Sequence, residues 1–183
     1  MKHLINLTII LSLLAQICLA QQAEKVKENK KVQIENVKEY KVVYDNIAAL
    51  VKQAKRDSIS YVGMTFSEFA KQLDKRGLKI MQTWITGYDS GKLYPQHVYA
   101  IMVRFTSDEA ENYARANDLW TPYIIVNFAA SKPFEKALSL IKQYKGYYNE
   151  EVAAFYADAV VQSLYFNCPD DIYLLKYRRA TEK

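Results

Sequence analysis

The stretch "YVGMTFSEFAKQLDKRG", Tyr61 to Gly77, reads as a helix with a start, an apolar face and an end. Thr65 and Glu68 have the spacing of a capping box, which satisfies backbone N–H groups at a helix N-terminus. Gly77 stands where a left-handed residue commonly ends a helix. We therefore expect a helix from about Phe66 to Arg76. Its apolar residues would be Phe66, Phe69, Ala70 and Leu73, and a face of this kind needs a sheet or another helix to cover it.

Three strand candidates follow this helix. The runs Leu78–Ile85 and His97–Phe105 are apolar and rich in β-branched residues, and the turn-forming stretch "TGYDSGKLYP" separates them. The short separation predicts an antiparallel pair. The segment "YIIVNF", Tyr123–Phe128, is apolar on both faces, which is typical of a strand in the interior of a sheet.

Apolar residues at steps of three and four predict further helices. One such stripe runs from Ile34 to Ala54 and predicts a long N-terminal helix that packs on the domain, with coiling against a partner as the less favoured use. The polar stretch 106–118 suggests a helical excursion between strands. Helices are also expected between Pro133 and Gly146, and after Asn149, which is followed by acidic residues favoured in a first turn.

The runs "VVQSLYF" (160–166) and "IYLLKYR" (172–178) are expected to close the chain as a hairpin across "NCPDD". The alternative is one continuous helix over Ala153–Phe166, because Val, Ala and Leu suit either structure. Strands joined by short loops argue against a parallel sheet. The predicted fold class is therefore α+β, with a long N-terminal helix and then a largely antiparallel sheet of four or five strands covered by helices.

The N-terminus has the pattern of a secretory signal peptide. Lys2 precedes an apolar run from Leu4 to Leu19, and Ala20 precedes polar sequence that begins at Gln21. The run is shorter than the ~20 residues that span a bilayer as a helix, so an uncleaved anchor is the less favoured interpretation. Lipidation at Cys18 is also disfavoured, because Ile17 stands where a small residue is required.

The predicted organisation is a signal peptide over 1–20, a charged helical or linker segment over 21–41, and a single α+β domain over 42–183. No transmembrane span is expected after cleavage, and the protein is expected in the periplasm or outside the cell. The mature chain would carry 24 basic and 20 acidic residues. These charges are mixed along the chain, so the sequence does not indicate a nucleic-acid partner.

The segment "VGMTFSEFAKQL", Val62–Leu73, resembles the helix-to-strand unit of small envelope proteins. Such units are found in outer-membrane assembly lipoproteins of the OmlA type and in β-lactamase inhibitor proteins. The resemblance implies a binding role without catalysis, on a sheet with helices on one side. The chain lacks the paired cysteines of the second family, so no functional residue is transferred. The whole domain is also similar to small secreted bacterial proteins without an assigned function.

Residues suited to catalysis are few. After loss of residues 1–20, His97 and Cys168 are the remaining histidine and cysteine, which excludes His-pair metal sites and an internal disulfide. No metal or cofactor is expected. A small secreted hydrolase that uses carboxylates or His97, with Cys168 as a conceivable nucleophile, is the alternative function. Turn and cap roles explain the aspartates more simply.

The chain is rich in tyrosine, with 15 tyrosines, seven phenylalanines and two tryptophans. Tyr and Trp give rigid contact area with a polar tip, which suits recognition of sugars or protein surfaces. Their alternative role is to line the core, because sheets favour aromatic residues. We expect an exported, noncatalytic binding or protein-interaction module of the bacterial envelope, whose ligand is an envelope glycan or another exported protein. The candidate binding residues, on or beside the two longer connections, are Tyr88, Tyr94, Tyr99 and Trp120.

Overall fold

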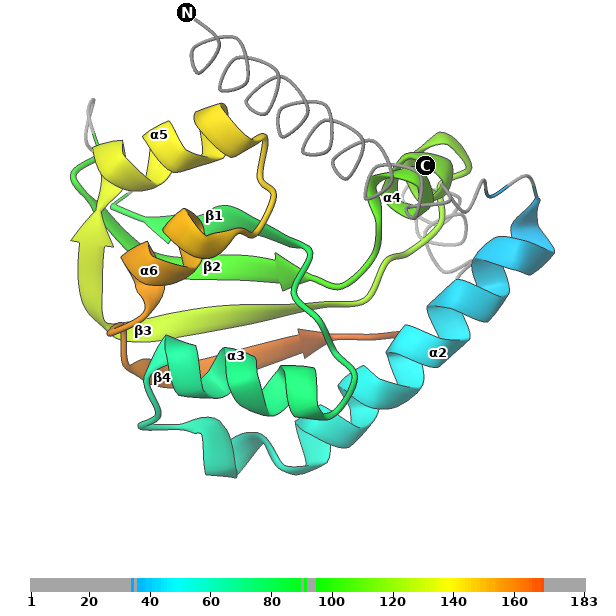
Figure 1. Ribbon diagram of the computed structural model, residues 1–183, viewed down its shortest axis with the longest axis horizontal. Coiled ribbons are helices and arrows are strands. Elements are labelled where there is room, and N and C mark those ends of the chain that lie inside the picture. The colour runs from blue at the N-terminus through cyan, green and yellow to red at the C-terminus, as the bar shows by residue number, and fades with distance from the viewer. Residues whose placement is uncertain (1–33, 35, 90, 92–94, 170–183) are drawn as a thin grey trace, which may run out of the picture. The chain divides into compact units, whose positions relative to one another are not determined.

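A computed structural model describes residues 34, 36–89, 91 and 95–169, which belong to one compact unit beginning at Ile34 (Figure 1). The predicted capped helix is confirmed as α3, Phe66–Lys75. The Thr65 hydroxyl accepts the Glu68 N–H at 3.3 Å, and the Glu68 carboxylate accepts the Thr65 N–H at 2.9 Å. Gly77 has a φ of +84°, the left-handed conformation expected after the helix.

Within the described residues the sheet has four antiparallel strands in the order β1-β2-β3-β4. These strands are β1 (Gln82–Tyr88), β2 (His97–Arg104), β3 (Tyr123–Pro133) and β4 (Val161–Asn167). Strand β3 lies between β2 and β4, so its predicted interior position is confirmed. The α+β fold class is confirmed as well.

The other helices also follow the sequence patterns. The long helix α2, Val37–Arg56, begins at Asn36, whose side chain accepts the N–H groups of residues 38 and 39. Asn149 caps α6 through the Val152 N–H at 3.0 Å. The remaining elements are the 3-10 helix η1 (Ser58–Tyr61) and the helices α4 (Asp108–Ala116), α5 (Phe134–Tyr144) and α6 (Glu150–Tyr156).

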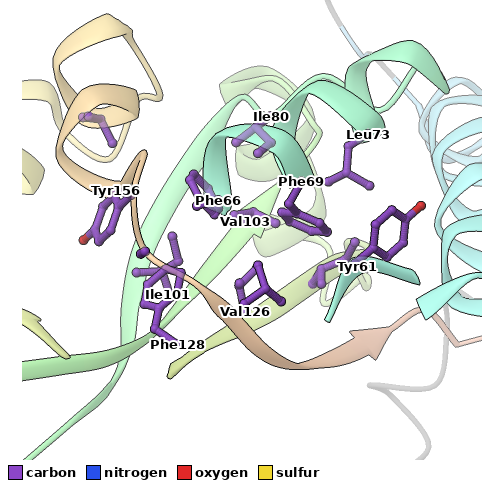
Figure 2. Close-up of a cluster of buried hydrophobic side chains, with 14 of the residues drawn as sticks. Tyr61, Phe66, Phe69, Leu73, Ile80, Ile101, Val103, Val126, Phe128 and Tyr156 are labelled. Atoms are coloured by element: carbon purple, nitrogen blue, oxygen red, sulfur yellow. The ribbon is translucent and has the colours of Figure 1, made fainter. Parts of the chain in front are cut away.

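Helices α3, α5 and α6 cover one face of the sheet, here called the inner face (Figure 1). Phe66, Phe69 and Leu73 of α3 are fully buried, Ala70 is partly buried, and the helix meets strand residues such as Ile101, Val126 and Phe128 (Figure 2). The Phe66 ring lies 6.0 Å from both the Phe128 and Tyr156 rings, which joins α3, β3 and α6. The inner face of the sheet therefore supplies the cover that the apolar face of α3 requires.

The N-terminal half of α2 forms a smaller apolar cluster with α4. Tyr40 and Tyr44 are buried there against Ala110, Ala114 and Leu119. The C-terminal half of α2 instead contributes Val51 and Ala54 to the main core. The prediction that α2 packs on the domain is therefore confirmed, and the helix continues without a break across residues 41 and 42.

Three sequence predictions of element bounds need correction. Strand β1 was expected at Leu78–Ile85 but begins at Gln82 and runs through Tyr88. A Cβ at Gly87 would lie 2.8 Å from Ala100 Cβ, so this glycine permits close strand approach inside the pair and is not part of the turn. Strand β3 continues to Pro133, beyond the expected end. The single helix considered for 153–166 is wrong, because α6 ends at Tyr156 and β4 follows.

Segments outside the four strands form backbone hydrogen bonds at both edges of the sheet, beside β1 and beside β4. Beside β1, the Thr83 N–H donates to the Gly146 carbonyl at 2.8 Å, and the Tyr148 N–H donates to the Met81 carbonyl at 2.9 Å. Beside the start of β4, the Gly63 N–H donates to the Val161 carbonyl at 2.8 Å. The Gly63–Val161 bond ties the segment before α3 to the last strand.

Some sequence predictions concern residues outside the described ranges. These are the signal peptide (1–20), most of the charged segment (21–41), the second strand of the C-terminal hairpin (172–178) and Tyr94. Among the described helices, none combines the length and the apolar character needed to cross a membrane.

Candidate functional site

The face of the sheet opposite α3, α5 and α6, here called the outer face, carries a row of large side chains. The strand register places one residue from each strand in this row, namely Trp84, Met102, Ile125 and Tyr165. Their neighbours Ile85, Ile101, Ile124 and Val126 point the other way into the core. Tyr165 is 57% exposed, and the other three are partly exposed. We call these four residues the outer row.

Contacts at the edge of the sheet hold the Trp84 ring in place. Its Nε1–H donates to the Gln82 side-chain oxygen at 3.0 Å. The amide nitrogen of Gln82 donates in turn to Asp108 at the start of α4, and the Tyr147 hydroxyl donates to the same carboxylate. One face of the ring lies against Gly146, with no room for a Cβ between them. The ring is therefore fixed at one end of the outer row.

A pocket of about 270 Å³ adjoins the outer row. Arg104 and Tyr123 are paired two residues further along β2 and β3, at the next position on the outer face, and both line the pocket. The rest of the lining comes from α4 and the segment that leads into β3. It consists of Glu111, Ala114, Arg115, Asp118, Leu119, Trp120 and Thr121. The outer row and this pocket form the candidate functional site.

A buried carboxylate organises the pocket. Glu111 is 5% exposed, and its Oε2 accepts from Arg104 Nη1 at 2.6 Å. The Thr106 hydroxyl donates to Oε1, and the Thr121 hydroxyl donates to Oε2 at 3.4 Å. A buried charge is tolerated when it is paired and hydrogen-bonded in this way. The network fixes Arg104 between the outer row and the pocket.

Trp120 closes the α4 side of the pocket. Its carbonyl accepts the Tyr40 hydroxyl, and burial together with the nearby charge of Glu111 raises the pKa of Tyr40. Tyr40 therefore remains a neutral donor in the physiological range. The indole Nε1 of Trp120 is buried without a hydrogen-bond partner among the described residues. Leaving such a donor unpaired costs free energy.

The structure does not gather the predicted binding residues into one site. Trp120 lines the pocket, whereas Tyr99 lies near the opposite end of β2, about 17 Å from Arg104 at ~3.3 Å per residue. Tyr88 is opposite the core residue Val98, and its ring packs against Phe134 of α5 at 5.5 Å. Tyr88 and Tyr99 are 45% and 44% exposed. Tyr94 lies outside the described residues.

The residues considered for catalysis are also separated. His97 Nδ1 lies 3.4 Å from an Asp89 carboxylate oxygen, but Asp89 also accepts the backbone N–H groups of Gln96 and His97 and so closes the β1–β2 connection. Cys168 follows the end of β4 on the far side of the sheet, where its thiol donates to the Ala48 carbonyl. His97 and Cys168 therefore do not form a nucleophile–base pair.

Comparison of the chain with protein-family models, with curated proteins and with solved structures finds no match. The candidate site therefore depends on the geometry alone. Sequence reasoning missed all four outer-row residues, which are Trp84, Met102, Ile125 and Tyr165, as site residues. The alternation of side chains along β2 and β3 could have indicated such residues. It shows which residues lie on the outer face only when the strand register is known.

Proposed function

We propose that this chain is an exported, noncatalytic binding module whose outer row and adjoining pocket bind another exported protein. The partly exposed outer row, next to a pocket lined by charged, aromatic and aliphatic side chains, is the observation that carries the proposal. Protein interfaces are enriched in Tyr, Trp, Met and Arg and have an apolar centre with a polar rim. Met102 and Ile125 supply the apolar centre, with Arg104 and Arg115 beside it.

An envelope glycan is the other ligand class that aromatic side chains suit. Two aliphatic residues between Trp84 and Tyr165 favour a protein surface, because sugar rings gain most from stacking on aromatic faces with polar groups nearby. A glycan-binding screen run beside the protein-capture experiment separates the two classes. Saturable glycan binding that Tyr165→Ala weakens would replace the protein partner with a glycan.

The test uses two exposed tyrosines that lie on different parts of the sheet. Tyr165→Ala alters the outer row, whereas Tyr88→Ala alters a ring that packs against α5. We expect Tyr165→Ala and Trp120→Ala to weaken capture of the partner from envelope extracts about tenfold or more, as central aromatic interface residues do. Tyr88→Ala should leave capture unchanged. Equal losses for Tyr88 and Tyr165, with melting temperatures preserved, would contradict the assignment of the outer row.

Export is the second element of the proposal. The apolar run before Ala20, followed by the polar stretch from Gln21, supports cleavage by a signal peptidase. N-terminal sequencing of the protein recovered outside the cytoplasm should begin at Gln21. A lipid-modified chain that begins at Cys18 would overturn this expectation.

A small hydrolase is the alternative, and the exposed His97 beside the mostly buried Asp89 carboxylate is the observation that favours it. An imidazole beside a carboxylate can act as a general base. Hydrolysis of an envelope substrate that His97→Ala abolishes, without a change in stability, would establish this alternative.

A further inference from the structure

The most exposed large apolar side chain among the described residues lies far from the candidate site. Ile59, in the short helix η1 between α2 and α3, is 83% exposed, and Val62 next to η1 is 47% exposed. Nothing in the described fold needs an aliphatic residue at position 59. We call Ser58–Val62 the apolar tip (Figure 1).

The core holds the apolar tip in this position. Tyr61, two residues after Ile59, is 1% exposed, and its ring packs edge-on against Phe69 at 5.3 Å (Figure 2). Just before the tip, Asp57 accepts a hydrogen bond from Arg76 Nη1 at 2.6 Å, which ties it to the end of α3. Because Asp57 and Tyr61, on either side of Ile59, are both held in place, Ile59 is kept exposed by the fold.

Basic residues flank the tip in the sequence and stand in the last turns of α2 and α3. Between Lys52 and Lys79 the chain has seven basic and three acidic residues. One of those acids, Asp57, is paired with Arg76. Lys55 and Arg56, in the last turn of α2, are exposed and have no ion-pair partner within the described ranges. An exposed aliphatic side chain is thus placed next to unneutralised positive charge.

We propose that the apolar tip docks the protein on an anionic lipid surface. Ile59 would enter the boundary between headgroups and acyl chains, while the basic residues at the ends of α2 and α3 bind lipid phosphates. A cluster of four to eight Lys and Arg residues has this affinity, and each contributes roughly fivefold to binding near the surface. The charge and the apolar side chain act together, as in interfacial anchors. This surface is separate from the outer row, so the two can be occupied at once.

The experiment adds one tryptophan to the full chain at either of two exposed aliphatic positions. Ile59→Trp places the reporter in the tip, and Val42→Trp places it on α2, where Val42 is 61% exposed. Vesicles of phosphatidylglycerol and phosphatidylcholine that carry brominated acyl chains quench a tryptophan that enters them. The comparison within one chain removes any contribution from residues 1–20, because both variants contain them.

On anionic vesicles we expect the tryptophan fluorescence of Ile59→Trp to shift to the blue and to be quenched. Both changes should be larger than those of Val42→Trp and of the parent chain. Pure phosphatidylcholine or high salt should abolish the difference. Removing both charges in Ile59→Trp by Lys55→Gln and Arg56→Gln should raise the lipid concentration at half-maximal quenching about 25-fold. Equal quenching at positions 59 and 42, or quenching that does not depend on lipid charge, would overturn the proposal.

Discussion

Replacing Gly146 with alanine tests whether the Trp84 ring is held as rigidly as the structure indicates. A Cβ at Gly146 would lie 2.5 Å from Trp84 Cζ2 and 2.7 Å from Cε2. The ring cannot move freely, because its Nε1–H is bonded to Gln82. Gly77 is a matched control, since it has the same φ of +84° but its added Cβ would meet only Leu50 Cδ1, at an ordinary 3.6 Å.

The two substitutions share one cost and differ in another. Each places a non-glycine residue in the left-handed region, which costs about 1 kcal/mol. Gly146→Ala adds overpacking of about 1–3 kcal/mol and threatens the Trp84–Gln82 hydrogen bond, which contributes about 1 kcal/mol. We therefore expect Gly146→Ala to destabilise the protein by about 2–3 kcal/mol more than Gly77→Ala.

Urea denaturation followed by far-UV circular dichroism gives the free energies of unfolding of both variants. In a Trp84→Ala background the difference between the two glycine positions should disappear, which a double-mutant cycle measures directly. Gly146→Ala should also weaken partner capture, since it displaces one end of the outer row. If the two variants are equally destabilised within about 0.5 kcal/mol, Trp84 is not confined and the reasoning about the outer row fails.

Three further predictions concern stability. Thr65→Ala should cost about 1 kcal/mol in urea denaturation. Hydrogen bonds from Thr65 lower the pKa of Glu68 in the folded protein. The capping box therefore contributes its full stabilisation above the unfolded-state pKa of Glu68. The destabilisation caused by Thr65→Ala should shrink as the pH falls through the lower pKa that Glu68 has in the folded protein. Tyr61→Phe should be neutral or stabilising in thermal melts, because the buried Tyr61 hydroxyl has no partner within the described residues; a clear loss of stability would reveal one. Glu111→Ala should cost about 3 kcal/mol because it leaves Arg104 and two threonines unpaired, while an effect below about 1 kcal/mol would show that the network is not structural.

The parts of the fold that the sequence predicts well are those set by local signals. Thr65 and Glu68 are three residues apart, and Asn149 precedes its helix directly, so each cap can be recognised without knowledge of the tertiary structure. The start of β1 was misplaced because Leu78 and Ile80 are apolar yet lie in an irregular segment. Both are buried under the helices, and burial alone made them resemble a strand.

The candidate site was much less predictable, because it depends on which face each residue occupies. Tyr88 and Tyr165 are both exposed tyrosines on strands, but only the register shows that they belong to different surfaces. Glu111 looks like an ordinary solvent-facing acid on a short helix. It is buried because Arg104, from a different element, supplies the opposite charge, and no local pattern encodes that pairing.

The pairing of residues beside α3 with the last strand determines when the chain can finish folding. Gly63 and Val161, joined by a backbone hydrogen bond, are 98 positions apart, and the Phe66 N–H likewise donates to the Ala159 carbonyl. Contacts of such long sequence separation form late and slow the folding of a domain. During synthesis from the N-terminus, α3 therefore lacks part of its cover until Ala159 and Val161 have been made. If the protein is exported as proposed, this delay would favour passage of the unfolded polypeptide through a secretion channel before its core closes.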